Sequence, residues 1–363
     1  MLSFKTGSEA QAQVRLSRLA PVVLLAAVVL QAGTHAQTLA FSVFERYLES
    51  LYQQAGIPGL SAAIVQSRRI VWERGFGLQN VESSIAATPD TPYPVGDITQ
   101  TFAATLLLQC AERGLLSLDA PMRQYTGLIP EPVSVRAVLA HASPDALGRF
   151  RYDPARYAAL TTVVDDCGAV PYRERLVEEI LNRLGMFDSV PGDDLADPTE
   201  ILRDMFDAAA LDRYAAVLRR RAVPYKVSRG KPTRVDYVPT SIDASTGLTS
   251  TVRDLARYDA ALDDGILLRP DTLAQAWTNA VSSSGVVLPS GLGWLVQSYE
   301  GQRVVWHFGL TPDSFSSLIV KVPGRDVTLI LLANSDGLSA PFPLREGDVT
   351  SSVFAKLFLR LFA

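Results

Sequence analysis

A small set of side chains could carry chemistry in this chain. Ser228 and Lys231 stand three residues apart, the spacing at which a lysine on a helix can take the proton of a serine nucleophile. They lie before Pro232 in a strand-rich segment, which offers no helix to carry the lysine, so we interpret the pair as a chance match. Ser143 is a second candidate hydroxyl, but no neighbouring residue is suited to act as its base.

Histidine and cysteine are too scarce for a metal centre to be expected. The chain has three histidines and two cysteines, and the spacing of Cys110 and Cys167 does not suit a zinc site. We therefore expect no metal and no cofactor. The two cysteines either form a disulfide, which an oxidising compartment permits, or pack as separate buried thiols, and both interpretations stay open.

Apolar periodicity outlines the elements that would position these side chains. Helices are predicted near residues 38–54, 99–113, 134–142, 154–167, 174–184, 200–221, 251–262 and 353–362. Strands are predicted near residues 60–65, 70–77, 225–227, 235–238, 293–296, 303–306, 316–320 and 327–332. This order predicts an α/β fold in which N- and C-terminal helices flank an antiparallel sheet. An all-helical subdomain, roughly residues 97–222, is inserted between the second and third strands.

Six short stretches occur in the same order as in a known family. They are Gly56–Ser61, Gly114–Pro121, Val138–Ser143, Arg183–Ser189, Ser245–Thr251 and Leu332–Ser335. Taken together they resemble the serine β-lactamase and penicillin-binding family, in particular its class C β-lactamase and esterase branch. The resemblance extends from about residue 41 to the C-terminus. It implies a β-lactamase/transpeptidase-like fold with a groove between the sheet and the helical subdomain.

The resemblance also implies where a catalytic centre would lie. In that family, catalysis depends on a serine with a lysine three residues later, on a tyrosine in a Tyr-x-Asn loop, and on a His- or Lys-x-Gly turn. Here Asp97 stands at the serine position and Gln100 at the lysine position. Tyr152 keeps the tyrosine, Pro154 replaces the asparagine, and residues 307–309 keep the turn. The residues expected to line the groove are Asp97, Tyr152, His307, Gly309 and Leu310.

The two replacements remove the machinery that forms an acyl-enzyme. A serine attacks only when a base takes its proton, and the Gln100 amide cannot act as that base. Losing one central residue of a serine protease costs about a million-fold in turnover. Asp97 and Gln100 have instead the spacing of an N-terminal capping box, whose aspartate would stabilise the helix by about 0.5–2 kcal/mol. The Asp97 carboxylate could also turn into the oxyanion hole.

The remaining polar candidates have structural alternatives. Tyr152 could bind a ligand or could pack between the two subdomains. His307 could face the groove or could be a neutral strand histidine. His141 is interpreted as structural, a cation or donor near the end of a short helix.

The first 36 residues have the parts of a secretory signal peptide. Lys5, Arg15 and Arg18 precede an apolar run of about 12 residues, and small residues lead to a cleavage site after Ala36. A membrane span needs about 20 apolar residues, so we expect cleavage and no stable membrane anchor. The mature domain would then be residues 37–363, secreted or periplasmic. Its net charge of −4 gives no sign of a nucleic-acid partner.

Three functions follow from these observations. The leading hypothesis is a catalytically silent protein that binds a peptidoglycan-derived peptide, a D-amino-acid peptide or a protein partner. The second is an active hydrolase of esterase, peptidase or β-lactamase type, in which Asp97 or His307 acts on water or an unrecognised serine attacks. The third is a structural or interaction protein whose groove is filled by side chains, and a small, closed groove would favour it.

Overall fold

A computed structural model of the chain describes residues 39–129, 131–145, 147–168 and 170–363. The predicted signal peptide at residues 1–36 lies outside the described residues. The chain divides into two units, Met1–Leu48 and Glu49–Ala363. A helix occupies residues 39–54 and so belongs to both. Within the described part of the chain, no helix combines the length and the apolar character needed to cross a membrane.

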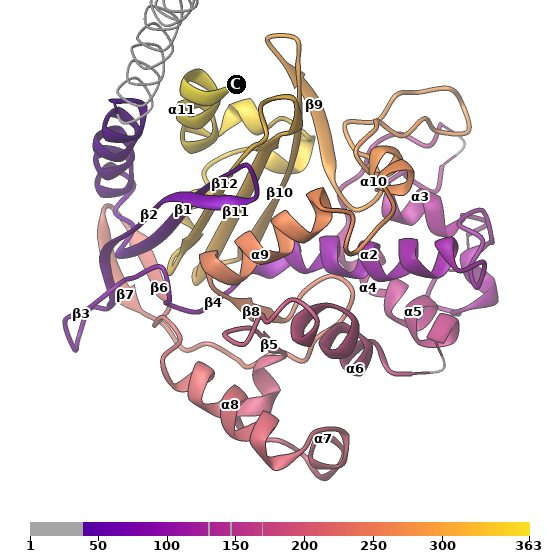
Figure 1. Ribbon diagram of the computed structural model, residues 1–363, viewed down its shortest axis with the longest axis horizontal. Coiled ribbons are helices and arrows are strands. Elements are labelled where there is room, and N and C mark those ends of the chain that lie inside the picture. Colours follow the sequence, from indigo (N-terminus) through magenta and orange to yellow (C-terminus); the bar gives the residue numbers. More distant parts are fainter. Residues whose placement is uncertain (1–38, 130, 146, 169) are drawn as a thin grey trace, which may run out of the picture. The chain divides into compact units, whose positions relative to one another are not determined.

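The larger unit is built on a seven-stranded antiparallel sheet (Figure 1). Its strand order is β3-β2-β1-β12-β11-β10-β9. The bounds are β1 (Gly59–Gln66), β2 (Arg69–Asn80), β3 (Ile85–Ala86), β9 (Leu295–Tyr299), β10 (Gln302–Thr311), β11 (Phe315–Val322) and β12 (Val327–Ala333). The first strand pairs with the last, with Leu60 opposite Ala333, so β1 and β12 are neighbours in the sheet although they are distant in the sequence.

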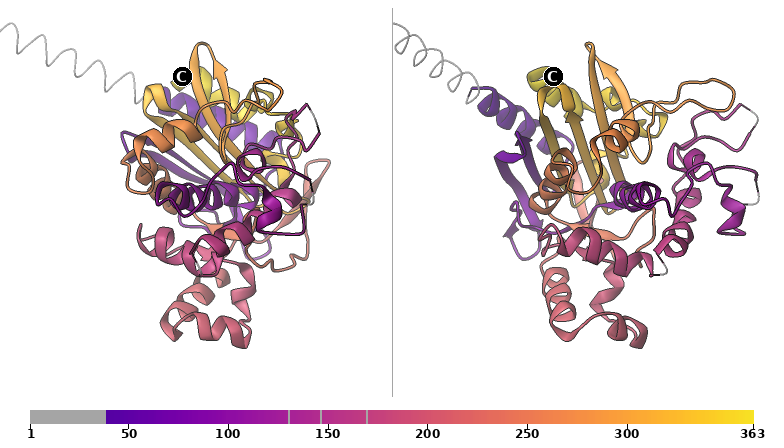
Figure 2. Two further views of the ribbon diagram at one scale, coloured as in Figure 1. Left: turned by 90° about the vertical axis from the view of Figure 1, so that its right-hand side faces the viewer. Right: turned by 45° about the vertical axis from the view of Figure 1, so that its right-hand side comes forward.

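A long helical block follows β1, β2 and β3 in the sequence, and it contains α2 to α8. The bounds are α2 (Thr99–Glu112), α3 (Val135–Leu139), α4 (Pro154–Ala158), α5 (Leu160–Gly168), α6 (Tyr172–Leu176), the π-helix η3 (Val177–Asn182), α7 (Glu200–Met205) and α8 (Ala208–Arg219). Figure 2 shows these helices gathered beside the strands. The predicted order of strands, helical block and strands is therefore confirmed, as is the antiparallel sheet.

Shorter elements complete the unit. They are β4 (Tyr93–Pro94), β5 (Val190–Pro191), β6 (Tyr225–Ser228), β7 (Lys231–Arg234), β8 (Leu248–Ser250), α9 (Val252–Asp263), α10 (Pro270–Ala276) and α11 (Val353–Phe362), together with the 3-10 turns η1 (Gly96–Ile98), η2 (Met122–Gln124), η4 (Asp193–Ala196), η5 (Pro323–Arg325), η6 (Asp336–Leu338), η7 (Leu344–Glu346) and η8 (Val349–Ser351). Strands β4, β8 and β5 form a second, three-stranded sheet.

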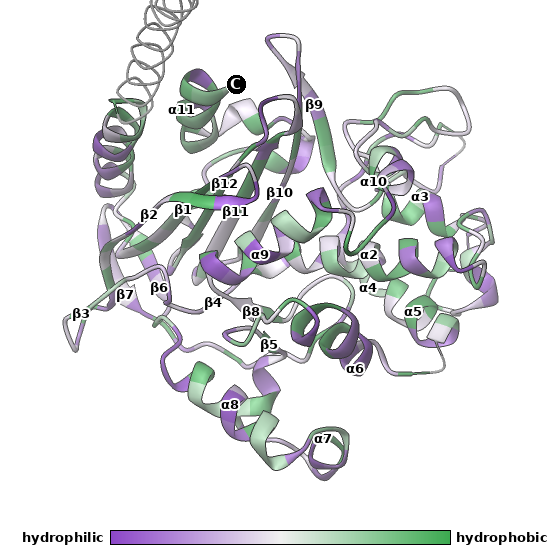
Figure 3. Cartoon of the chain, in the orientation of Figure 1, coloured by the Kyte–Doolittle hydropathy of each residue, from purple (hydrophilic) through white to green (hydrophobic). Residues whose placement is uncertain are grey.

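Both faces of the central strands are covered. Every residue of β11 and β12 is buried, which an antiparallel sheet shows only when both faces carry other elements. In Figure 1, α9 lies below the sheet and α11 above it. Figure 3 colours much of the central strands and of α11 as hydrophobic. Helix α2 is buried from Thr99 to Cys110, so the start of this helix is held inside the molecule.

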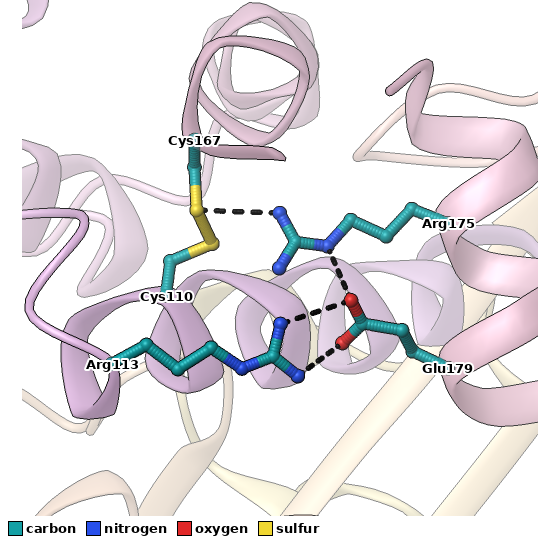
Figure 4. The surroundings of a disulfide bond; sticks show 5 residues. All are labelled: Cys110, Arg113, Cys167, Arg175 and Glu179. Atoms are coloured by element: carbon teal, nitrogen blue, oxygen red, sulfur yellow. Dashed lines mark hydrogen bonds and ion pairs between the residues drawn. A yellow bond between two sulfur atoms is a disulfide. The ribbon is translucent and has the colours of Figure 1, made fainter. Parts of the chain in front are cut away.

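A disulfide ties two helices of the helical block together. Cys110 near the end of α2 is bonded to Cys167 of α5 (Figure 4). The Arg175 guanidinium lies 3.2 Å from the Cys167 sulfur, and Glu179 accepts hydrogen bonds from both Arg175 and Arg113. The bond and the ion pairs join α2, α5, α6 and the following π-helix into one cross-linked group.

The structure corrects the prediction for residues 225–238. Arg229 and Gly230 both have positive φ, 52° and 73°, and make a two-residue turn that pairs Ser228 with Lys231. The second strand of this hairpin is therefore β7, and the strand predicted at residues 235–238 is absent. Ser228 and Lys231 lie on an exposed hairpin with no helix, in line with the interpretation that their spacing is a chance match.

Candidate functional site

Asp97 lies in the turn η1, which is pressed against the middle of the large sheet. The Val95 amide donates to the Leu248 carbonyl at 2.9 Å, and the Ser317 hydroxyl donates to the Val95 carbonyl at 2.7 Å. The approach to β10 is so close that a Cβ on Gly309 would lie 2.0 Å from the Val95 oxygen. Only glycine fits at this position, and the turn is thereby fixed against β10 and β11.

The predicted capping box is wrong. Helix α2 begins at Thr99 with Ile98 as its N-cap, and no side chain caps it. Asp97 is already in helical geometry within η1, and the Gln100 side chain points to other partners. The first turn is held instead by the Thr99 hydroxyl, which donates to the Gly96 carbonyl at 2.7 Å. The helix therefore gains no cap from the Asp97 carboxylate.

A directional chain of hydrogen bonds ends at Asp97. The Asp153 amide donates to His141 Nδ1 at 3.3 Å, so the ring proton is carried on Nε2. His141 Nε2 then donates to Gln100 Oε1 at 3.0 Å, and Gln100 Nε2 donates to the Tyr152 hydroxyl at 3.5 Å. The Tyr152 hydroxyl in turn hydrogen-bonds the Asp97 carboxyl. Gln100, at the lysine position, thus links His141 to Tyr152 through two hydrogen bonds and accepts no proton.

His141 belongs to this centre, which the sequence interpretation missed. The residue is 4% exposed, and its ring stacks on Tyr152 and Tyr157 at centroid distances of 4.5 and 5.1 Å. Burial lowers the pKa of His141 to about 3, so the ring is neutral and cannot serve as a cation at the end of α3. Its position after α3, with φ of 51°, turns the ring towards Gln100.

Electrostatics at Asp97 disfavour the ionised form. Burial raises the pKa of Asp97 to about 7, while the Arg345 charge and the Tyr152 hydrogen bond act in the opposite direction. The Asp243 carboxylate raises the pKa further. Asp97 is 6% exposed, and its Oδ2 atom has no hydrogen-bond partner among the described residues. An ionised carboxylate here lacks much of the solvation that it has in water.

His307, Gly309 and Leu310 lie on β10 beside this turn, so the structure brings the predicted site residues together. The rings of His307 and Tyr152 are 6.2 Å apart. His307 is 1% exposed and accepts the Phe308 amide at Nδ1 over 3.0 Å. Burial lowers the pKa of His307 to about 4, so this ring is also neutral. The Leu310 amide nitrogen lies 3.0 Å from the position that a Cβ on Gly96 would take.

A segment that the sequence did not single out lies next to the Tyr152 ring. Arg345, on the turn η7, places its guanidinium carbon 6.0 Å from the Tyr152 ring centroid. Two residues later, Gly347 fits so tightly that a Cβ would lie 2.5 Å from the ring of Pro289. Arg345 therefore borders the site from the C-terminal side.

Neither of the two cavities identified in the described part of the chain is lined by Asp97, Tyr152 or His307. Within the same residues, no group of three or more His, Cys, Asp or Glu side chains is placed to hold a metal ion. The arrangement can exchange a proton at one buried carboxyl and can donate and accept hydrogen bonds.

Comparisons with known proteins agree with the observed fold. The beta-lactamase family profile matches residues 44–349. A putative penicillin-binding protein, PbpX of Bacillus subtilis (strain 168), is 23% identical over 301 residues, which cover 74% of this chain and 70% of the relative. A beta-lactamase of Pseudomonas fluorescens is 24% identical over 349 residues, which cover 81% of this chain and 93% of the relative.

Solved structures show the same architecture. The octameric penicillin-binding protein homologue from Pyrococcus abyssi superposes with a TM-score of 0.69 at 21% identity, covering 88% of this chain and 76% of that one. D-amino acid amidase from Ochrobactrum anthropi SV3, complexed with L-phenylalanine amide, gives 0.68 at 20% identity, covering 88% and 99%. With a profile match across most of its length, the chain belongs to the beta-lactamase family.

Proposed function

We propose that this chain is a secreted, non-acylating member of the beta-lactamase family that works by binding and not by hydrolysis. One observation carries the proposal. The serine position holds Asp97, a buried carboxyl at the end of the chain through Tyr152, Gln100 and His141. No hydroxyl nucleophile with an adjacent amine stands there, so the covalent step that opens a lactam or an ester has no attacking group.

The rim of this centre supports a ligand class. The Arg345 guanidinium is exposed above the partly buried Tyr152 ring, where a cation and an aromatic face lie together. A peptide that ends in a carboxylate would pair with the guanidinium and pack its terminal side chain on the ring. We therefore propose a cell-wall peptide ending in a D-amino acid as the ligand, bound without bond formation.

Isothermal titration with acyl-D-Ala-D-Ala and with muropeptides tests this ligand. Binding should weaken about ten-fold or more in the Arg345→Gln variant, because a charge-assisted hydrogen bond is lost. Arg325→Gln is the matched control, since Arg325 is an exposed arginine on the turn η5. The absence of heat with every peptide would contradict the ligand class and leave a protein partner or a purely structural role.

A second candidate function has an observation of its own. A carboxyl whose pKa is about 7 is suited to take a proton from water at neutral pH, as a general base does. Turnover of nitrocefin or p-nitrophenyl esters would support this hydrolase, provided that Asp97→Ala or His307→Ala abolishes it. Turnover that survives both substitutions would come from another site or from a contaminant.

A further inference from the structure

A cavity of about 690 Å³ lies away from the family catalytic centre. One side of the cavity is formed by α3 and the segment after it, and the other side by α10 and the segment after it. The two helices lie side by side in Figure 1. We propose that this cavity binds an uncharged, largely apolar small molecule that carries one hydrogen-bonding group. The inference does not depend on the proposed function.

The floor of the cavity is apolar and made of small side chains. Ala140, Ala142 and Leu288 form a separate hydrophobic cluster, and Ala137 and Ala280 pack against it. Because alanine fills little volume, α3, α10 and the segments after them meet here without closing the space between them. A void of this size and lining is large enough for a small organic ligand.

The walls are fixed in place before any ligand arrives. Asn279 Nδ2 donates to the Leu288 carbonyl at 2.7 Å and to the Val296 carbonyl at 2.8 Å. The Ser282 hydroxyl reaches the Leu147 carbonyl at 3.3 Å, which joins the two loops across the cavity. A preformed cavity does not have to lose loop entropy when a ligand binds.

The charges that line the cavity are already paired. Arg136 donates to both carboxylate oxygens of Asp119, at 2.7 and 3.2 Å. Asp145 accepts the amides of Leu147 and Gly148, both at 2.9 Å. Arg136 and Asp145 are the only charged side chains among the lining residues in the described part of the chain. A charged ligand would find no unpaired counter-ion here, which favours an uncharged one.

Ser143 brings a buried hydroxyl to the cavity. Ser143 lines the cavity and is 8% exposed, and its hydroxyl has no hydrogen-bond partner of normal geometry among the described residues. A hydrogen bond from this hydroxyl is the main cause that lowers the pKa of the Asp145 carboxyl, although the two groups do not meet in normal hydrogen-bond geometry. A hydroxyl with so poor a bond can instead hydrogen-bond a carbonyl or amide group of a ligand.

The probe is 4-phenylbutanamide, which joins an apolar body to a neutral amide, and its control is the carboxylate 4-phenylbutanoate. Isothermal titration calorimetry of the full chain should show saturable binding of the amide and weaker binding of the carboxylate. Ser143→Ala should weaken amide binding about five-fold, the effect of one hydrogen bond. Because the hydroxyl makes no hydrogen bond of normal geometry, we expect the substitution to leave the melting temperature nearly unchanged.

Ala137→Trp is the variant that fills the cavity, and Ala208→Trp on the exposed first turn of α8 is its matched control. We expect the first to abolish binding of 4-phenylbutanamide and the second to leave it unchanged, with circular dichroism showing that both are folded. Absence of saturable binding to the unmodified chain at millimolar amide would overturn the proposal. So would equal affinity in the unmodified chain and a folded Ala137→Trp variant.

Discussion

Replacing Asp97 by asparagine should stabilise the protein, and the gain should depend on pH. A carboxyl whose pKa rises from 3.8 to about 7 on folding binds more protons in the native state than in the unfolded state between these pH values. Stability contributed by this group therefore falls as the pH rises, by about 1.4 kcal/mol per pH unit, and levels off above pH 7. The total reaches about 4 kcal/mol. Asparagine has nearly the same shape and does not ionise, so it escapes this loss.

The assay is urea unfolding of both proteins at a series of pH values from about 5 to about 8.5. The free energy of unfolding of Asp97→Asn minus that of the unmodified chain should increase with pH and then reach a plateau. Taking the difference cancels the titration of all other groups. In a Tyr152→Phe background the plateau should move to higher pH, because the Tyr152 hydrogen bond lowers the Asp97 pKa. A difference that does not change with pH would refute the reasoning, and a loss of stability at every pH would restore the capping interpretation.

Three further predictions concern the supporting structure. Reducing the Cys110–Cys167 bond, which closes a sequence separation of 57 residues, should lower the free energy of unfolding by about 4 kcal/mol in urea titrations with and without reductant. In the second, His141 is replaced by asparagine, which tolerates the positive φ of this position. The histidine has a pKa of about 3 in the folded chain and about 6.5 in the unfolded chain, so acid favours unfolding of the unmodified protein. The His141→Asn variant should therefore lose less stability when the pH falls below about 6.5. Lys321 is 2% exposed and pairs with Asp259 at 3.0 Å. Replacing Lys321 by methionine should lower the free energy of unfolding by about 3–5 kcal/mol in chemical unfolding, because a buried carboxylate is left unpaired. Unchanged unfolding curves would contradict the first and third predictions, and equal acid sensitivity of both proteins would contradict the second.

The sheet was predictable because its strands carry a strong local signal. Residues 327–332 form a continuous apolar run, and such a run with turns on both sides indicates a strand buried on both faces. The pairing of β1 with β12 follows from no local pattern, and the sequence analysis did not predict it. At residues 225–234 a local signal was missed: the two turn residues between Ser228 and Lys231 place the second strand of the hairpin earlier in the sequence than predicted.

The site was harder to predict because its geometry depends on tertiary packing. Asp97 and Gln100 have capping-box spacing, but burial of the whole first turn directs Gln100 towards His141. His141 sits within a recognised motif stretch, and only its positive φ, which spacing does not reveal, turns the ring into the centre. Arg345 lies in a C-terminal segment without periodicity, and its placement over Tyr152 depends on close packing that involves Gly347.

Intact-protein mass spectrometry tests the central claim most directly. The mature chain, expected at residues 37–363, would be incubated with a penicillin and with a fluorophosphonate, beside an active serine β-lactamase as a positive control. We predict no added mass on this chain with either reagent, because the position of the nucleophile holds Asp97. A single stoichiometric adduct would contradict the claim, and mapping the modified residue would identify the nucleophile.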